Sequence, residues 1–597
     1  MPDSPAHDGR RDGLRLALMN NRFDGIVRAM MNTLLRSARS AILNTARDFS
    51  CCVLTADGQM LAMAESLPIH VMSGPDLMAR HLLEVHPELR AGDAFLNNSP
   101  YHGNSHAADW SLLVPVIDAH GTHRYTVLAK AHLADCGNSV PTTYSASARD
   151  VYEEGALIFP CVQVQSGYRD REDVLRMART RIRVPELWYG DYLALVGAAR
   201  IGERRLLGLL DEVGPDPLVD YEREWFDYSE QRFADAVRRM PSGRTRLRGR
   251  HDPVPGAPNG IEIEVVVDVD AEQGRVAVDL RDNPDCQPCG LNLTEATART
   301  AAMIGVFTAL GDDVPPNAGS FRRLDVALRE NCVVGIPRHP HSCSAATTNL
   351  AELTANLVAA AIAELAEGFG MAATGRCQAP SCGVISGTDP RPGGGAYVNQ
   401  LMLASTGGAG GPRADGWLTT LGIGAAGFLL RDSVEIDEMK YPIRVREQRL
   451  LPDSEGAGRF RGSPGAYVEY EPIGAPMDVI YLSDGTYNAP QGVRGGHDGT
   501  LAQQRKRHRD GTQSDELGAY AEVRLEPGEA IVSVCCGGAG YGAPAERDPE
   551  RVATDVREGL VTTARARDVY RVALTAEGTV DPDGTAALRT SERQVPA

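Results

Sequence analysis

The chain has 597 residues, of which 43% are hydrophobic and 23% are charged, and these proportions exclude wholesale disorder. Asp and Glu number 79 against 61 Lys and Arg, which gives a net charge of −18 at pH 7. This acidic balance excludes the basic footprint that nucleic acids and anionic membranes require. The 12 cysteines are scattered and do not form the framework of a disulfide-rich secreted protein, so we expect a cytoplasmic location.

The first 250 residues are predicted to form one domain of helices and strands. Apolar residues from Phe23 to Ala38 recur at helical spacing, which predicts a helix over 22–47. A strand over 51–54 follows, and then helices near 74–88 and 170–180. A long helical region over 193–239 is broken by the Gly-Pro-Asp-Pro run at 214–217.

Beyond residue 250 the pattern shifts towards strands. We expect strands over 261–269 and 275–280, helices near 293–310 and 347–367, a β-rich stretch over 441–534 and a final helix over 548–571. The predicted fold class is α+β, with several domains of mixed helices and mainly antiparallel sheets. The predicted domains are an N-terminal metal-site domain over 1–250, a central α/β domain over 251–430 and a C-terminal β-rich domain over 431–597 with a terminal helix.

Histidines concentrate in one predicted hairpin. Five of the 14 histidines fall between residues 102 and 132. The apolar run at 110–117, the turn at 118–123 and the strand at 124–132 predict a β-hairpin centred between His120 and Gly121. This register pairs positions whose numbers sum to 241, so Asp109 lies opposite His132, with Cβ atoms about 4.5–5.5 Å apart. His106 lies just before the first strand.

Two interpretations of this hairpin are open. His106, Asp109 and His132 could converge as a nitrogen and oxygen donor set, which suits Zn²⁺, Mn²⁺ or Fe²⁺ better than Ca²⁺ or Mg²⁺. Alternatively, the hairpin is merely polar and its histidines cap backbone groups or face solvent. We expect the second situation for His120 and His123, because both fall at the predicted turn.

Two other patterns carry little chemistry. Cys286 and Cys289 form a lone CxxC pair with no second pair at zinc-finger spacing, so buried or incidental thiols are expected. The glycine-rich stretches at 392–395 and 406–411 lack both GxGxxG spacing and the Gly-Lys-Ser/Thr ending of a phosphate loop. We therefore expect no familiar ATP-binding loop in this chain.

Several segments together resemble one known family. Residues 97–109 (NNSPYHGNSHAAD) resemble the Asn-Asp-Pro-Tyr-x-Gly-Gly-Thr-His-x-x-Asp signature of the hydantoinase B/oxoprolinase family. Residues 131–137 (AHLADCG) resemble its Ala-His-His-x-Asp-x-Gly segment, and 47–50 (RDFS) its Arg-Arg-Asp-Phe-Ser element. Further matches, in the same order along the chain, lie at 152–155, 316–320, 441–445, 456–462, 537–542 and 547–550.

The resemblance implies one half of an ATP-dependent machine. In this family, an A-type partner subunit with an actin-like ATPase fold binds ATP and magnesium and phosphorylates an amide, lactam or ketone oxygen. The B-type subunit, which this chain resembles, carries a divalent metal and completes the reaction in a hetero-oligomer. By the family's pattern, Asp48, His106, Asp109 and His132 look like the metal ligands, and zinc or manganese is the expected metal.

Three further residues are candidates for roles beside the metal. Asp135 could orient a ligand imidazole or take a proton, or it could simply cap a turn. Glu154, beside Glu153, could act as a catalytic carboxylate, or the two could form a solvated pair. His102 could contact either a ligand side chain or the substrate.

The family resemblance also has departures. Ser99, Asn104, Leu133 and Asn138 replace residues that are usual in the family, so the pocket around the ligands is altered. The predicted function is hydrolysis of a C–N bond of a hydantoin, oxoproline-like or lactam substrate after phosphorylation by the partner. Two alternatives stay open: a subunit of an ATP-dependent ketone carboxylase of the acetone or acetophenone type, and a non-catalytic scaffold subunit.

Overall fold

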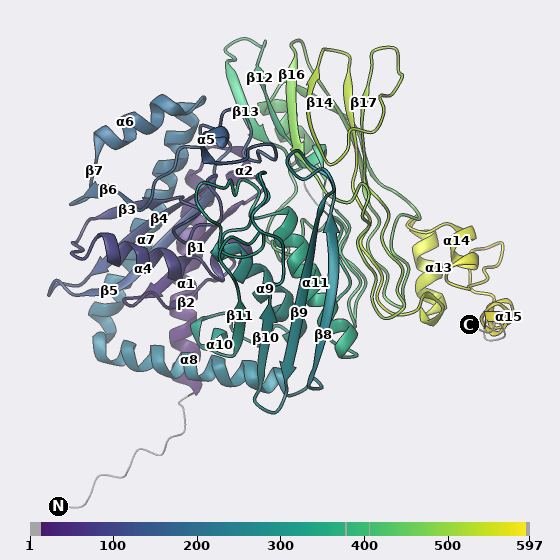
Figure 1. Ribbon diagram of the computed structural model, residues 1–597, viewed down its shortest axis with the longest axis horizontal. Helices are drawn as coiled ribbons and strands as arrows, with labels where there is room; N and C mark the ends of the chain where they lie inside the picture. The colour runs from purple at the N-terminus through teal and green to yellow at the C-terminus, as the bar shows by residue number, and fades with distance from the viewer. Residues whose placement is uncertain (1–12, 377–378, 405, 593–597) are drawn as a thin grey trace, which may run out of the picture.

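The computed structural model describes residues 13–376, 379–404 and 406–592. Within these ranges, the strands form one seven-stranded sheet and three four-stranded sheets. Neighbouring strands are antiparallel apart from the parallel pair β10–β11. Figure 1 shows the N-terminal elements at one end of the molecule and the C-terminal helices at the other. The expected α+β class with mainly antiparallel sheets is confirmed.

The seven-stranded sheet holds the candidate site. Its strands, in spatial order, are β2 (Met60–Ala62), β1 (Phe49–Thr55), β5 (His123–His132), β4 (Asp109–Ile117), β3 (Ala94–Asn97), β6 (Val162–Ser166) and β7 (Arg169–Asp170). One face is covered by three helices, α1 (Gly13–Ser37), α7 (Pro185–Val213) and α8 (Pro215–Val237), which share an apolar core with it. Shorter helices of the same region are α2 (Ala41–Asn44), α3 (Pro68–Val71), α4 (Pro75–Val85), α5 (Val151–Glu154) and α6 (Glu172–Arg181).

The helix predicted over 22–47 ends earlier than expected. α1 stops at Ser37 and the short α2 begins at Ala41. The Asp191 carboxylate on α7 accepts the backbone N–H groups of Arg39 and Ser40, at 2.6 and 3.1 Å. This long-range contact turns the chain between the two helices, and a local pattern cannot reveal it.

A second sheet shares an apolar core with the other face of the first. Its order is β11 (Leu324–Ala327), β10 (Arg275–Asp279), β9 (Ile261–Asp270) and β8 (Gly243–His251). Helices α9 (Glu295–Leu310), α10 (Ala318–Phe321) and α11 (Asn349–Leu365) accompany it, and α11 lies against both α9 and β8. This core extends into the C-terminal region, since it also includes Val384, Val398 and Leu482. The predicted domain boundaries stay a prediction.

The C-terminal region contains two sheets that share a core. One has the order β13 (Ala396–Gln400), β12 (Val384–Thr388), β16 (Met477–Leu482), β18 (Tyr520–Leu525), and the other β14 (Ile443–Leu450), β15 (Ala466–Pro472), β19 (Ala530–Val534), β17 (Gln503–Arg507). Short helices in this part are η1 (Pro380–Cys382), α12 (Val434–Lys440) and η2 (Pro544–Glu546).

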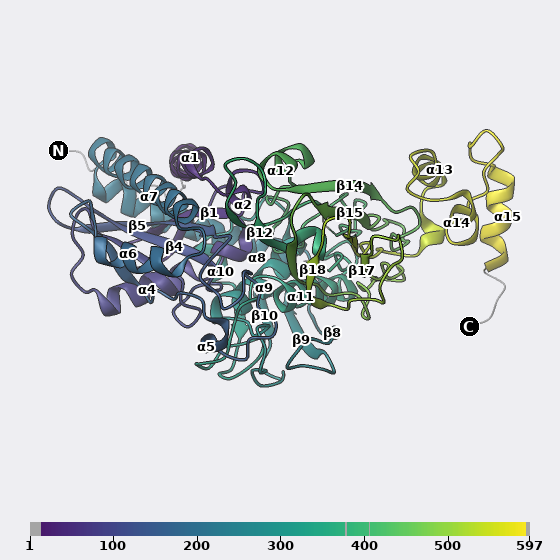
Figure 2. The same cartoon turned by 90° about the horizontal axis from the view of Figure 1, so that it is seen from above.

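A small helical lobe ends the described chain, and Figure 2 shows it set apart from the sheets. It consists of α13 (Pro549–Arg557), α14 (Thr563–Asp568) and α15 (Pro582–Glu592). The single helix predicted over 548–571 is therefore wrong. Gly559 adopts a positive φ of 73° after α13, and the Thr562 side chain caps the start of α14, so the chain turns between two helices.

None of the helices in the described part of the chain combines the length and the hydrophobicity that crossing a membrane requires.

Candidate metal centre

Three neighbouring strands place the central residues of the site in one row. In the β4–β5 pair, Asp109 lies opposite His132, so the predicted register is confirmed. In the β1–β5 pair, Phe49 lies opposite Ala131, and the His132 N–H donates to the Asp48 carbonyl at 3.0 Å. Because side chains alternate between the two faces of a sheet, Asp48, His132 and Asp109 project from the same face. This face points away from α1 and α7, towards α3 and the second sheet.

His106 comes from a loop that two asparagines hold. The Asn98 amide donates to the carbonyls of Ala107 and Leu157 at 2.7 and 2.8 Å. The Asn104 amide donates to the carbonyls of His106 and Asp109 at 2.6 and 2.8 Å. Asn104, one of the departures from the family pattern, therefore holds the backbone carbonyls of both site residues.

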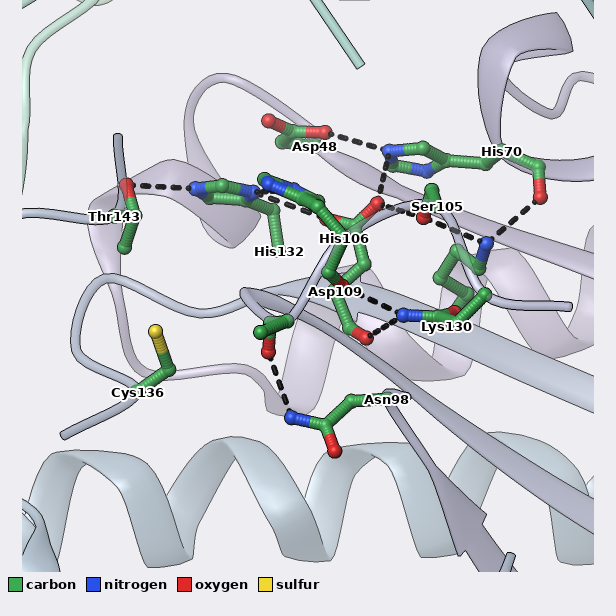
Figure 3. A network of polar contacts seen from close by, with 12 residues as sticks. Asp48, His70, Asn98, Ser105, His106, Asp109, Lys130, His132, Cys136 and Thr143 are labelled. Carbon is green, nitrogen blue, oxygen red and sulfur yellow. Dashed lines mark hydrogen bonds and ion pairs between the residues drawn. The ribbon is translucent and has the colours of Figure 1, made fainter. Parts of the chain in front are cut away.

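The donor atoms of His106, Asp109 and His132 converge on one another (Figure 3). Asp109 Oδ1 lies 2.9 Å from His106 Nε2 and 3.0 Å from His132 Nδ1, and the two ring nitrogens are 3.2 Å apart. All three residues are at most 1% exposed. The sequence interpretation of a converging donor set thus agrees with the geometry.

Each of the two imidazoles has a second ring nitrogen that faces away from Asp109, and the partner of that nitrogen bears on where the ring proton lies. His106 Nδ1 lies 2.7 Å from the Ser344 carbonyl. A carbonyl only accepts, so Nδ1 carries the proton and Nε2 presents a lone pair to Asp109. His132 Nε2 lies 3.2 Å from Thr143 Oγ1, a hydroxyl that can donate to this nitrogen or accept from it. Lone pairs that face each other in a dry site need a proton or a cation between them.

The electrostatics of the cluster support this reading. Burial alone would raise the pKa of Asp109, but the positive charge of His106 and the hydrogen bonds from His106 and His132 hold it well below its usual range. Burial opposes a charge on His106, yet the Asp109 carboxylate raises the pKa of that imidazole. Both directions favour a proton held between His106 Nε2 and Asp109 Oδ1. A set of two imidazoles and carboxylates is the donor chemistry of zinc and manganese sites.

Asp48 borders this group of three. Its carboxylate is 7% exposed, and Oδ1 lies 3.5 Å from His70 Nε2. Burial raises the pKa of Asp48 to about 6, against the positive charges of His132 and His106. The structure thus brings three of the four suggested ligands together, and places Asp48 beside them in contact with His70.

Sequence reasoning missed two residues of the cluster. His70, on α3, lies 3.3 Å from Asp109 Oδ2, and burial lowers its pKa to about 3. Lys130, two residues before His132 on β5, is 1% exposed, and burial lowers its pKa to about 8. Strand alternation could have placed Lys130 on the face of His132, whereas no local pattern links His70 to the hairpin.

Glu154 lies close behind His106. Its carboxylate accepts the Ser342 hydroxyl at 2.6 Å, and the same hydroxyl accepts the Ser344 N–H at 3.3 Å. Ser344 is the residue whose carbonyl accepts His106 Nδ1–H. Burial raises the pKa of Glu154. Glu154 is buried, whereas Glu153 pairs with Arg149 at the surface, so the two do not form a solvated pair.

The structure does not bring Asp135 to the donor atoms. Its carboxylate accepts the backbone N–H groups of Gly137 and Arg183, at 3.1 and 2.6 Å, and pairs with the Arg183 guanidinium at 3.2 Å. These contacts are those of a turn-capping carboxylate, the alternative that the sequence left open.

The other hairpin histidines lie elsewhere. His102 Nδ1 is 2.8 Å from Ser99 Oγ, and its ring stacks on His81 of α4 at 4.1 Å, so these contacts are not with the cluster. His120 is exposed. His123 Nε2 lies 2.9 Å from Thr126 Oγ1. Cys286 and Cys289 are buried free thiols, as expected.

Comparison with curated proteins finds relatives over nearly the whole chain. The chain is 28% identical to the beta subunit of caprolactamase from Pseudomonas jessenii, over 97% of this chain and 99% of that protein. It is 27% identical to the B-type subunit of a putative D-/L-hydantoinase from Pseudomonas sp. strain NS671, over 97% and 98%. It is 24% identical to the delta subunit of acetophenone carboxylase from Aromatoleum aromaticum, over 94% and 86%.

A solved structure and a family model agree with these relatives. The crystal structure of the ATP-dependent caprolactamase from Pseudomonas jessenii matches with a TM-score of 0.86 at 26% identity, over 98% of this chain and 100% of that chain. The sequence model described as Hydantoinase B/oxoprolinase matches residues 12–544. The chain therefore belongs to the hydantoinase B/oxoprolinase family.

Proposed function

We propose that this chain is the metal-binding subunit of an ATP-dependent hydrolase of cyclic amides. The observation that supports it most is the convergence of His106 Nε2, His132 Nδ1 and Asp109 Oδ1 in a buried site beside Asp48. The names of the relatives point to the same chemistry, since they include subunits of a caprolactamase and of a hydantoinase.

Asp48, His106, Asp109 and His132 would hold the ion, and zinc or manganese suits this donor set. When bound, such an ion supplies Lewis acidity and a nucleophile from water near neutral pH. The protein's own contribution is to fix the donors: Ser344 orients His106, Thr143 faces His132, and Tyr144 stacks on both rings at 5.8 and 5.5 Å.

Among the predicted catalytic residues, Glu154 has the better supported place. Through Ser342 it holds the segment whose carbonyl orients His106. Its proposed contribution is therefore to position that imidazole, and Glu154→Gln should weaken activity while the ion stays bound. Asp135 and His102 are proposed to shape the surrounding loops rather than to react.

The substrate ring needs an apolar space, and one lies beside α3. A cavity of about 660 Å³ is lined mainly by apolar side chains, among them Met63, Met72, Phe307, Trp417 and Phe428. Pro68 of α3 also lines it, while His70 of the same helix faces the cluster. This size and lining suit a small uncharged ring, so we propose this cavity as the approach for a lactam or hydantoin.

ATP is proposed to act on a separate A-type subunit with an actin-like fold, in a hetero-oligomer with this chain. The relatives named as subunits support an assembly of this kind. A cytoplasmic location fits the free buried thiols of the described cysteines.

The first test is metal analysis of protein purified without a histidine tag. About one zinc or manganese per chain supports the site, and its absence contradicts the proposal. The second test combines the chain with its ATPase subunit and measures ATP-dependent opening of ε-caprolactam, hydantoin and 5-oxoproline. A chain that binds no metal and only increases the activity of its partner is the scaffold subunit.

The similarity to the delta subunit of acetophenone carboxylase favours one second candidate, a subunit of an ATP-dependent ketone carboxylase. The same complex can be assayed with acetone or acetophenone and labelled bicarbonate. Incorporation of label into a carboxylate product, with no opening of cyclic amides, would replace the hydrolase proposal with this one.

A further inference from the structure

A second row of side chains lies one step along the sheet from the first. In the β1–β5 register, Ser50 lies opposite Lys130. These residues are two positions from Asp48 and His132 on their strands, so they project from the same face. All four are buried. Helix α3 places His70 beside both rows, near Ser50 of the second and near the two carboxylates of the first (Figure 3).

His70 lies between two carboxylates. Its Nε2 is 3.3 Å from Asp109 Oδ2 and 3.5 Å from Asp48 Oδ1. Asp109 therefore divides its two oxygens: Oδ1 faces His106 and His132, while Oδ2 accepts the Ser105 hydroxyl and faces His70. Figure 3 shows His70 on the side of the carboxylates away from the two converging imidazoles.

The Ser50 hydroxyl indicates which nitrogen of His70 carries the proton. Ser50 Oγ accepts the Leu67 N–H at 2.9 Å and lies 3.2 Å from His70 Nδ1. Because Nε2 faces two carboxylate oxygens, which only accept, Nδ1 is the ring nitrogen left to accept the Ser50 hydroxyl proton. The ring proton then sits on Nε2, facing the carboxylates, and a protonated ring nitrogen is not a metal ligand.

Lys130 holds both His70 and the hydroxyl that contacts Asp109. Its ammonium donates to the His70 carbonyl at 2.9 Å and to Ser105 Oγ at 3.0 Å. Ser105 in turn donates to Asp109 Oδ2. One buried cation thus holds the helix that carries His70 and the hydroxyl that holds the same carboxylate oxygen.

We propose that His70 is a positioning residue rather than a metal ligand: its Nε2–H holds the outer oxygens of Asp48 and Asp109, with Ser50 setting the tautomer and Lys130 the placement. This inference rests on the proposed metal site. A positioning role for His70 would keep the two carboxylates and the imidazoles of His106 and His132 in a fixed geometry towards an ion. His70 itself would then stay outside the set of ligands.

The test compares His70→Ala, His70→Gln and Ser50→Ala with wild type, and uses Zn²⁺ and Co²⁺ alone as probes. Zn²⁺ affinity is measured by competition with a chelator, and X-ray absorption of the Co²⁺ protein counts imidazole ligands. Loss of a partner that orients ligands typically costs about 10–100-fold in metal affinity. We expect that loss for His70→Ala, a smaller one for Ser50→Ala, and two imidazoles in every variant.

His70→Gln is the rescue variant, because its amide N–H can replace Nε2–H, so it should keep more affinity than His70→Ala. His123→Gln is the matched control, since His123 lies on the same hairpin but contacts Thr126, and it should match wild type. Circular dichroism confirms that each variant is folded.

Three results would overturn the inference. Loss of one imidazole from the Co²⁺ shell of His70→Gln would make His70 a ligand. Unchanged Zn²⁺ affinity in His70→Ala would remove its positioning role. Failure of wild type to bind either ion would instead overturn the proposed function, and the inference with it.

Discussion

Two buried clusters in this protein have nearly the same composition and opposite organisation. The first is the candidate metal centre. The second, here called the His251 cluster, lies where β8, α11 and the segment after β16 meet, and consists of His251, Asp252, Asn349, Arg376 and Asp484. Both contain histidine, two aspartates and a basic residue, and both are almost fully buried.

The His251 cluster pairs every acceptor with a donor. The Asp252 carboxylate accepts backbone N–H groups of Thr486, Tyr487 and Asn488, at 2.5–3.2 Å. Asp484 pairs with Arg376 at 2.8 Å. His251 meets the Asp252 carbonyl with one ring nitrogen and the Asn349 amide with the other.

At the candidate metal centre, acceptors face acceptors instead. Asp109 Oδ1 and His106 Nε2 present lone pairs to each other at 2.9 Å. The comparison shows that neither burial nor composition marks a candidate metal site. A candidate metal site is marked by hydrogen-bond acceptors that face one another, because only a cation or a proton between them can relieve their repulsion.

The largest expected effect separates the two clusters by metal content. His106→Ala removes one of the converging ligand atoms. The affinity for the metal should therefore fall by roughly 100-fold or more, as expected for loss of a ligand. Asp252→Ala should keep a full complement of metal. Mass spectrometry of dialysed protein measures both, and full occupancy in His106→Ala would contradict the assignment.

The second effect is on the free energy of unfolding, and here the variant in the His251 cluster should show the loss. Asp252→Ala leaves three backbone N–H groups without their acceptor and unbalances a buried cluster, which should lower the free energy of unfolding by about 3–5 kcal/mol. Urea unfolding measures the change. The exposed Glu272 offers a matched control, since Glu272→Ala should stay within about 0.5 kcal/mol of wild type. Equal stability of the two variants would mean that water replaces the carboxylate.

A third buried carboxylate tests the same idea through pH. Glu352 of α11 accepts the backbone N–H groups of Ile423 and Gly424 at 2.7 and 2.9 Å, and burial raises its pKa to about 7, against these bonds. A folded-state pKa above the unfolded value means that the folded state binds the proton more tightly. The contribution of Glu352 to the free energy of unfolding therefore falls as pH rises from about 4.5 to 7.

Relative to Glu352→Gln, wild type should therefore lose on the order of 2–3 kcal/mol across that interval and nothing further above it. Urea unfolding of both proteins at pH 5, 6, 7 and 8 measures the difference. Parallel pH profiles would show that the Glu352 carboxyl titrates normally.

The smallest effect concerns a histidine of the hairpin that belongs to neither cluster. His120 is exposed at the turn, where its backbone N–H donates to Asp118 at 2.9 Å. His120→Ala should leave metal content unchanged and alter the free energy of unfolding by less than about 0.5 kcal/mol. Any loss of metal would contradict the hairpin register.

Much of the site could be predicted from local patterns. Strand alternation and the symmetric turn were enough to place Asp109 opposite His132, because pairing in a hairpin depends only on the turn between its strands. The same local logic failed for the terminal helix, where Gly559 and the Thr562 cap divide one predicted helix into two.

The sequence by itself determined the α+β class, the hairpin register and, through its family motifs, the four residues proposed as ligands. Only the tertiary structure decided that His70 joins them, that Lys130 supports the carboxylates, and that Asp135 serves a turn. These contacts unite α3, a loop and three strands, and packing of separate elements, not spacing along the chain, fixes such distances. Buried residues of similar types can therefore form a cluster in which every acceptor is paired, or a candidate site for a cation.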